Sequence, residues 1–204
     1  LTVDNIEDFL GPQKYHYDTT FDKDEVGIAR GLAWTQVGGD TLTIEVNIMN
    51  GTGHVELTGR LGDVMKESAK AAIGYIRSQT DRMNINPDFY KDKDIHVHVP
   101  EGAVPKDGPS AGITLATAII SALTNRKVRR DVAMTGEITL RGRVLPIGGL
   151  KEKLSAACRA NVRQVLMPME NMRDLAEVPK QITDNLEITP VSNMDDVLKN
   201  ALAE

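Results

Sequence analysis

The sequence has little cysteine and no long apolar run. The single cysteine, Cys158, excludes a disulfide within the chain and suits a reducing compartment. No apolar run reaches the roughly 18 residues that a membrane-spanning helix needs. The first residues, Leu1–Leu10, are acidic and lack the basic region of a signal peptide. We therefore expect a cytoplasmic protein that does not contact membranes.

Excess positive charge and a nucleotide-binding motif are also missing. The formal net charge is −5, which gives no support to nucleic-acid binding by this chain. The pattern G-x-x-x-x-G-K-[ST] does not occur, so we expect no Walker-type ATP binding and no cofactor here. The 204 residues suffice for one large domain, or for one domain with an appendage. Because the chain does not begin with Met, we expect it to be part of a longer protein.

The N-terminal half is predicted to be rich in hairpins. Apolar and polar residues alternate from Leu42 to Ile48, which is typical of a half-buried strand. Turns are expected at Gly38–Asp40 and Gly51–Gly53. A helix is expected from residue 63 to about 79, with Asp63 as its N-terminal cap. The strands expected in this half span residues 26–34, 41–49, 54–58 and 95–99.

The C-terminal half is predicted to alternate strands with helices. Its expected strands span residues 132–135, 138–145, 164–167 and 187–191. Its expected helices span residues 149–160, 170–177 and 194–203, the last capped near Asn193. A hairpin-rich half followed by an alternating half favours an α+β fold with a mixed sheet. Before all of these, residues 2–10 predict a short helix and residues 13–25 a polar linker.

The segment PKDGPSAG, residues 105–112, is the first candidate for a functional site. Pro109 disfavours helix at Gly108, and an apolar helix is predicted immediately afterwards. Ser110 is therefore expected within a residue or two of a helix N-terminus. Unpaired N–H groups and partial positive charge at such an end can hold an oxyanion. Ser110 is either a nucleophile or a helix cap, which is the commoner role of serine there.

A serine nucleophile needs a base, and helical geometry selects Lys153. At about 100° per residue, Lys153 falls in the middle of an apolar arc, whereas Lys151 falls toward solvent. To act as a base near pH 7, a lysine must be desolvated enough to lower its pKa by about 3 units. The alternative is that Lys153 packs only its stem and keeps its ammonium group in water. The arc consists of Leu150, Leu154, Ala156, Ala157 and Ala160.

These segments resemble the proteolytic domain of Lon, the ATP-dependent serine protease. Besides PKDGPSAG, the resemblance rests on MTGEITLRGRVLPIGG and GGLKEKL, residues 134–149 and 148–154, and it extends from about residue 26 to the C-terminus. It implies a Ser-Lys dyad of Ser110 and Lys153 and a fold similar to domain 2 of ribosomal protein S5. Residues 1–25 then correspond to the end of the helical subdomain of the ATPase module and a linker, and residues 26–204 to the proteolytic domain.

The resemblance also implies the activity of the complete protein. It is expected to be a serine endopeptidase that hydrolyses unfolded or damaged proteins and peptides. A hexameric ring is implied, together with ATP and Mg²⁺ used by an ATPase module that is absent from this chain. Two other functions compete with this one: a small-molecule kinase of similar fold that binds phosphate at the serine loop, and a non-catalytic assembly module.

Three residues are expected to support the dyad. The hydroxyl of Thr135 could hold the Lys153 amine, and a threonine in this position has that role in the resembled family. Asp107 could pair with Lys153 in a resting state, which would keep the lysine charged. Gly108 lies between Asp107 and the nucleophile loop. The alternatives are an ordinary strand threonine and a solvated loop carboxylate.

The remaining candidates are one tryptophan and two histidines. Trp34 is expected either to line a substrate groove or to belong to the core. His96 and His98 share one face of a predicted strand, the arrangement from which a metal site could begin. They lack an evident third ligand, so no metal is expected.

Overall fold

The computed structural model of the protein describes residues 9, 11, 23–35, 38–100 and 106–203. The helix expected at residues 2–10 and the linker expected at 13–25 lie largely outside these residues. The boundary between the two domains, placed at residue 25, therefore stays a prediction.

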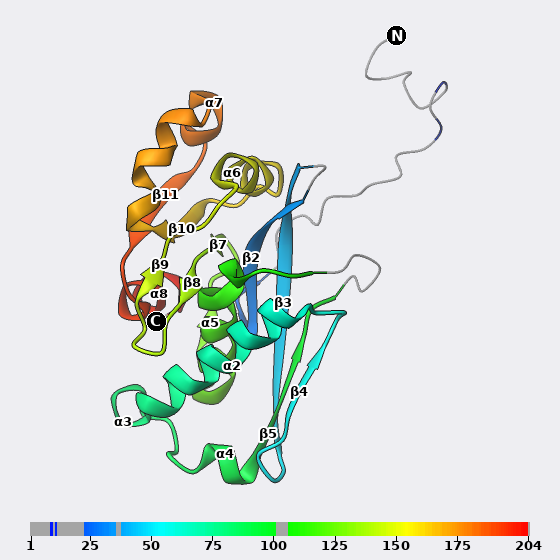
Figure 1. The fold of residues 1–204 in the computed structure, drawn as a ribbon, viewed down its shortest axis with the longest axis vertical. Coiled ribbons are helices and arrows are strands. Elements are labelled where there is room, and N and C mark those ends of the chain that lie inside the picture. Colours follow the sequence, from blue (N-terminus) through cyan, green and yellow to red (C-terminus); the bar gives the residue numbers. More distant parts are fainter. Residues whose placement is uncertain (1–8, 10, 12–22, 36–37, 101–105, 204) are drawn as a thin grey trace.

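Seven strands form one mixed sheet with the order β11-β10-β7-β2-β3-β5-β4 (Figure 1). The pairs β2–β3 and β3–β5 are antiparallel, and the other neighbours are parallel. The predicted mixed sheet is confirmed: both antiparallel pairs come from the N-terminal half, and the parallel strands β7, β10 and β11 come from the other half. The N-terminal half is less rich in hairpins than expected, because β4 pairs in parallel with β5 and not with β3. The strands are β2 (Ile28–Thr35), β3 (Gly38–Asn50), β4 (Val55–Thr58), β5 (Lys93–His98), β7 (Val132–Met134), β10 (Gln164–Pro168) and β11 (Glu187–Val191).

Two short pairs of strands lie outside this sheet. One joins β1 (Glu25–Val26) to β6 (Lys127–Val128), and the other joins β8 (Glu137–Ile138) to β9 (Val144–Leu145); both are antiparallel. The second pair follows β7 directly, so the chain reverses just beyond the edge of the sheet where the site is built.

Helices cover both faces of the sheet and divide the interior into two hydrophobic cores. Successive residues of β10 point to opposite faces, so Leu166 lies in one core and Val165 and Met167 in the other. The larger, which we call the α2/α5 core, contains residues of α2 (Asp63–Ser78), α5 (Gly112–Thr124) and α8 (Met194–Ala201). The smaller, the α6 core, contains residues of α6 (Leu150–Arg159). The remaining helices are α3 (Thr80–Met83), α4 (Phe89–Asp92), α7 (Lys180–Thr183) and the 3₁₀ segments η2 (Pro109–Ala111) and η3 (Met169–Glu177).

The sequence predictions failed at four places. The segment 138–145 is not one strand: Gly142 has a φ of 75° and donates its N–H to Thr139, so the chain turns between β8 and β9. Gly38–Asp40 is not a turn but the beginning of β3, paired with β2. The segment 170–177 belongs to η3, a 3₁₀ rather than an α-helix. Asp63 is the first residue of α2, and the cap position is occupied by Gly62.

The central helix α5 is buried because its sequence is apolar on all sides. Its residues 112–121 are all buried, and it ends where Asn125 adopts a left-handed conformation. A buried helix cannot tilt without disturbing the α2/α5 core, so its first turn is a rigid base for the residues just before it.

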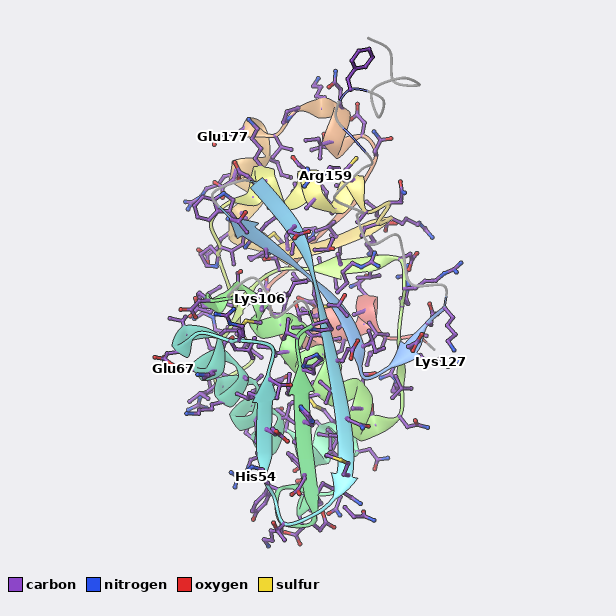
Figure 2. All side chains as sticks on the ribbon, turned by 90° about the vertical axis from the view of Figure 1, so that its right-hand side faces the viewer. His54, Glu67, Lys106, Lys127, Arg159 and Glu177 are labelled. Atoms are coloured by element: carbon purple, nitrogen blue, oxygen red, sulfur yellow. The ribbon has the colours of Figure 1, made fainter. Side chains whose placement is uncertain are left out.

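At the end of the sheet farthest from the α6 core, one face of the strands is not covered by any helix of the described residues. In Figure 2, the strands β3, β5 and β4 lie in front, with no helix before their lower ends. The outward residues Glu45, Asn47 and Met49 are exposed there. In the part of the chain that the structure describes, no helix is long and apolar enough to span a membrane.

Candidate active site

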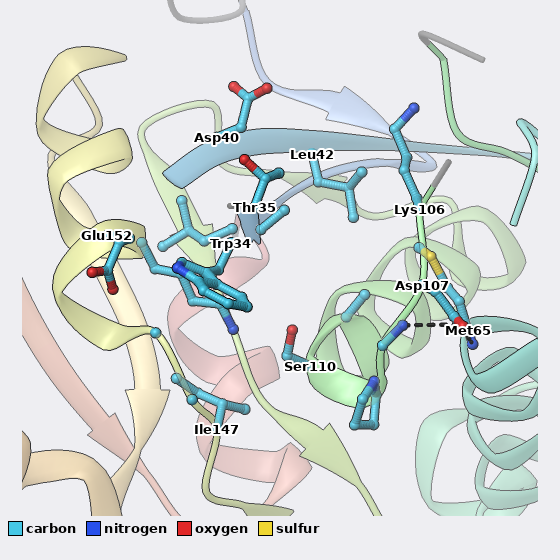
Figure 3. Close-up of a pocket in the computed structure, with 18 of the residues that line it drawn as sticks. Trp34, Thr35, Asp40, Leu42, Met65, Lys106, Asp107, Ser110, Ile147 and Glu152 are labelled. Atoms are coloured by element: carbon cyan, nitrogen blue, oxygen red, sulfur yellow. Dashed lines mark hydrogen bonds between the residues drawn. The ribbon is translucent and has the colours of Figure 1, made fainter. Parts of the chain in front are cut away.

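Ser110 lies in the 3₁₀ turn η2, directly before α5, within the range that the sequence predicted. It is not a helix cap: the cap positions of η2 and α5 are Gly108 and Ala111, and neither helix has a side-chain cap. Its carbonyl oxygen accepts a 2.8 Å hydrogen bond from the N–H of Gly136. Its hydroxyl points into the pocket on the side facing Trp34 (Figure 3).

The pocket is a cavity of about 560 Å³ that contains both members of the expected dyad. Ser110 and Lys153 line it together with Trp34, whose side chain is 56% exposed. The ring of Trp34 packs directly on Gly149, where an added Cβ would lie 2.8 Å from the tryptophan Cγ. The expectation that Trp34 lines a groove is thus confirmed, and its role toward substrate stays a prediction. The other apolar lining side chains include those of Leu32, Leu42, Met65 and Ile147.

Lys153 is 2% exposed, although it carries an ionisable amine. The interpretation that its ammonium group reaches water is therefore wrong, whereas Lys151, two residues earlier, is exposed as the helical wheel predicted. Desolvation by burial lowers the pKa of Lys153 from 10.5 to about 8. At this pKa roughly a tenth of the amine is neutral at pH 7, and that fraction can accept a proton.

Thr135 connects the two residues of the expected dyad. It follows the last residue of β7, is 0% exposed, and its N–H donates to the carbonyl of Leu166 in β10. Lys153 Nζ donates to Thr135 Oγ1 at 3.1 Å, and Thr135 Oγ1 donates to the Ser110 carbonyl at 3.4 Å. The expected contact between Thr135 and the Lys153 amine is confirmed, and its role in catalysis stays a prediction.

No hydrogen bond joins Ser110 Oγ to Lys153 Nζ among the bonds of the described residues. Both groups face one cavity, and the Thr135 bridge links the lysine amine to the backbone of Ser110. In many enzymes the bond between nucleophile and base forms only in the complex with substrate.

The carboxylate of Asp107 is not where a resting state would require it, which is beside the Lys153 amine. Its Oδ1 accepts hydrogen bonds from the N–H groups of Met65 and Gly108, each at 3.0 Å. Over the ranges that the structure describes, Asp107 forms neither a hydrogen bond nor an ion pair with Lys153, so their pairing stays a prediction. Gly108 has a φ of 139°, which favours glycine, and it begins the turn that carries Ser110.

His96 and His98 lie away from this cavity, on the open face of the sheet. Both rings hydrogen-bond Thr58 Oγ1, His96 through Nε2 at 2.9 Å and His98 through Nδ1 at 2.7 Å. Within the described residues, no group of three or more His, Cys, Asp or Glu side chains is arranged to hold a metal ion.

Sequence reasoning missed two residues that hold the nucleophile turn. Gly136 donates to the Ser110 carbonyl, and Ser68 in α2 donates to the Pro109 carbonyl at 3.5 Å. Gly136 could have been noticed next to Thr135, but its partner follows only from the packing of η2 against β2 and β8. Ser68 carries no signal, because it appears as one small residue in a helix.

Comparisons with known proteins agree with the geometry. A sequence model of Lon protease (S16) C-terminal proteolytic domains matches residues 1–204. Lon protease 1 of Syntrophobacter fumaroxidans is 58% identical over 202 residues, which cover 99% of this chain and 25% of that protein. Lon protease 2 of Desulfotalea psychrophila is 61% identical over 198 residues, covering 97% and 26%. Lon protease 1 of Bacillus subtilis is 54% identical over 202 residues, covering 99% and 26%. The chain thus spans about a quarter of the length of these curated relatives.

Proposed function

The chain belongs to the family of Lon protease C-terminal proteolytic domains, and on that basis we propose that it is a serine endopeptidase domain with Ser110 as nucleophile and Lys153 as base. The observation that carries the proposal is the burial of Lys153, which lowers its pKa to about 8 in the cavity that Ser110 also lines. A buried lysine costs stability, so a catalytic use accounts for it better than a structural one does.

The dyad would act in two balanced steps. Ser110 Oγ attacks the scissile carbonyl carbon while the neutral Lys153 amine takes the hydroxyl proton. The C–N bond then breaks, Lys153 returns the proton to the leaving amine, and an ester of Ser110 remains. Water attacks this ester with Lys153 again as base; the ester C–O bond breaks, and the proton returns to Ser110.

The oxyanion of each tetrahedral intermediate needs donors beside Ser110. Pro109 has no N–H group, so the nearest backbone donors are those of Ser110 and Ala111 in η2, directly before α5. They lie at the N-terminal end of a buried helix, where partial positive charge favours an anion.

Thr135 is proposed to orient the base. Because its hydroxyl donates to the Ser110 carbonyl, its oxygen is free to accept from Lys153. A neutral amine that donates to Thr135 keeps its lone pair for the Ser110 proton. Thr135 thereby fixes both the position and the direction of the base.

The wider activity is a proposal about the complete protein. It would hydrolyse unfolded or damaged proteins in the cytoplasm as a hexameric ring, with ATP and Mg²⁺ bound by an ATPase module. The sequence of this chain contains no Walker motif, so ATP should not change its own peptidase rate. We also propose that its fold is similar to domain 2 of ribosomal protein S5.

The two competing functions fit the site less well. A non-catalytic assembly module predicts that Ser110 is a cap and that the Lys153 amine reaches water, but Ser110 caps neither helix and Lys153 is 2% exposed. A small-molecule kinase would need the serine loop to hold phosphate, and it gives the buried lysine no role.

A serine-reactive probe tests the proposal. The intact mass is measured after treatment with a fluorophosphonate, for wild type, Ser110→Ala and Ser155→Ala. Ser155 lies in α6 and donates to the carbonyl of Lys151, so its loss should not affect labelling. One added phosphonyl group is expected in wild type and in Ser155→Ala, and none in Ser110→Ala. Labelling of Ser110→Ala, or none of wild type, would refute Ser110 as nucleophile.

A further inference from the structure

The segment that precedes the nucleophile is bound to the start of helix α2. The N–H of Gly62 donates to the Lys106 carbonyl at 2.8 Å, and the N–H of Lys106 donates to the Arg60 carbonyl at 3.3 Å. Leu61 and Lys106 form a parallel bridge. These contacts hold the chain four residues before Ser110 against the residues that lead into α2.

The carboxylate of Asp107 adds a further contact, with the first turn of α2. The cap position of α2 is Gly62, which has no side chain to accept from the free N–H groups of the first turn. Asp107 performs that role from another part of the chain, because its Oδ1 accepts from the N–H of Met65 in that turn. The same oxygen accepts from Gly108, two residues before Ser110. In Figure 3, Asp107 points to Met65 and away from Ser110.

Glycine is required at position 62 for space rather than for backbone freedom. Its φ of −70° and ψ of 173° are open to any residue. A Cβ there would lie 2.3 Å from Asp107 Cγ and 2.6 Å from Asp107 Cβ, so the loop would have to move away. The absence of a side chain at Gly62 is therefore what lets the Asp107 carboxylate reach α2.

The nucleophile turn is held from two sides. On one side are the contacts of α2 with Asp107 and the Ser68 bond to the Pro109 carbonyl. On the other, Gly136 and Thr135 both donate to the Ser110 carbonyl. Helix α2 is a firm support because its buried side chains belong to the α2/α5 core.

From these contacts we propose that Gly62 and Asp107 are positioning residues for the nucleophile. The carboxylate of Asp107, seated against Gly62, fixes where the turn η2 lies and hence where Ser110 Oγ lies relative to Lys153. The proposal rests on Ser110 and Lys153 being the dyad. A side chain added at position 62 would slow labelling only by displacing Asp107. The effects of substituting the two positioning residues should therefore not add.

The experiment compares single and double substitutions with a matched control. The variants are Gly62→Ala, Asp107→Ala, Asp107→Asn and the double variant Gly62→Ala with Asp107→Ala. The control is Gly51→Ala, because a Cβ at Gly51 would lie 2.0 Å from Asp94 Cγ. Asp94 likewise accepts backbone bonds, from Thr52 and His54, but His54 lies at the lower end of the sheet, far below Lys106 in Figure 2.

Three quantities are measured for each variant: the rate of Ser110 labelling by a fluorophosphonate, the amide hydrogen exchange of residues 106–112, and the Tm. Gly62→Ala and Asp107→Ala should each slow labelling at least about tenfold well below the Tm, because a shift of about 1 Å can cost about a hundredfold. The double variant should be no slower than the slower single variant. Asp107→Asn should recover most of what Asp107→Ala loses, since an amide oxygen accepts the same bonds. Exchange should quicken in Gly62→Ala, whereas Gly51→Ala should label as wild type despite a lower Tm.

The proposal is overturned if folded Gly62→Ala labels and exchanges as wild type does, or if the two single effects multiply in the double variant. It is equally overturned if Gly51→Ala loses as much labelling as Gly62→Ala. If Gly62→Ala does not fold, the labelling rates of Asp107→Ala and Asp107→Asn test the proposal, because neither substitution introduces a steric clash with α2. If wild type is not labelled while the exchange of residues 106–112 still responds to Gly62→Ala, the dyad assignment fails and the contact with α2 stands.

Discussion

Lys153 Nζ donates a 3.1 Å hydrogen bond to Thr135 Oγ1 in a position where the lysine is 2% exposed. The bond satisfies one N–H of the amine, but no carboxylate of the described residues pairs with it. Burial therefore acts on the amine without a carboxylate to oppose it and lowers its pKa to about 8. The burial of this amine therefore affects both its capacity to accept a proton and the stability of the folded chain.

Removing either member of the dyad should abolish peptide hydrolysis. Ser110→Ala removes the attacking oxygen and Lys153→Ala the base, so each should lower the peptidase rate by at least about a thousandfold while the fold persists. Lys151→Ala should keep most of the rate, because Lys151 is exposed on the same helix. Cleavage of a short fluorogenic peptide measures the rate, and circular dichroism checks the fold. An inactive Lys151→Ala together with an active Lys153→Ala would show that the base is misassigned.

The peptidase rate should rise with pH through about 8. Only the neutral amine can take the Ser110 proton, and burial lowers the pKa of Lys153 to about that value. Asp107→Asn should leave the rising limb where it is, because Asp107 hydrogen-bonds Met65 and Gly108 rather than Lys153. The pH–rate profile at low substrate concentration is the measurement. A limb that shifts to lower pH in Asp107→Asn would instead support the pairing of Asp107 with Lys153.

Lys153 should make stability depend on pH. Its pKa is about 8 in the folded state against 10.5 as the ordinary value, so between these values the unfolded chain binds more protons. The free energy of unfolding should therefore rise between about pH 8 and 10.5. At about 1.4 kcal/mol per pH unit, the charged lysine costs up to about 3 kcal/mol at pH 7. Lys153→Met should be more stable at pH 7, with a smaller gain at pH 10.5. Urea unfolding at both pH values tests this, and an equal gain at both would contradict it.

Thr135 should be needed through its hydroxyl. Thr135→Val keeps the shape of the side chain but leaves the Lys153 amine without its acceptor, so the rate should fall roughly 10- to 100-fold. Thr135→Ser retains the hydroxyl and should retain most of the rate. Because an acceptor favours the ammonium form, its removal should also move the rising limb of the pH profile to lower pH. A merely structural effect would reduce the rate without that displacement.

Local signals predicted where Ser110 and Lys153 lie, whereas the resemblance to Lon assigned them as a dyad, and that assignment stays a prediction. The position of Lys153 follows from the 3.6-residue period of one helix, and that of Ser110 from prolines and glycines next to it. Local signals also caused an error: the apolar positions of 138–145 resemble one strand, yet Leu140 is 62% exposed at the turn between β8 and β9.

The contact of Asp107 with α2 could not be predicted in the same way. Asp63 has the residue type and the place expected of a cap, but the free N–H of Met65 meets a carboxylate from far along the chain. Which carboxylate accepts from Met65 depends on how the loop packs over Gly62, and the hydrophobic periodicity of the sequence does not indicate this packing. The 3₁₀ form of η3 and the early beginning of β3 could not be predicted for a related reason, since tertiary packing overrides local propensity there.

The elements that carry Ser110 and Lys153 pack into different cores: η2 and α5 into the α2/α5 core, and α6 into the α6 core. We predict that the smaller core opens first, as a separate cooperative unit, and takes the base with it, while the serine and its helix remain in place. On heating or in denaturant, the domain would then lose its peptidase activity before it unfolds globally. It would stop cleaving neighbouring molecules while most of its fold persists. Peptidase activity should accordingly disappear at a lower urea concentration than the hydrogen-exchange protection of the α5 amides, since α5 belongs to the larger core. Coincident transitions would mean that the two cores unfold as one.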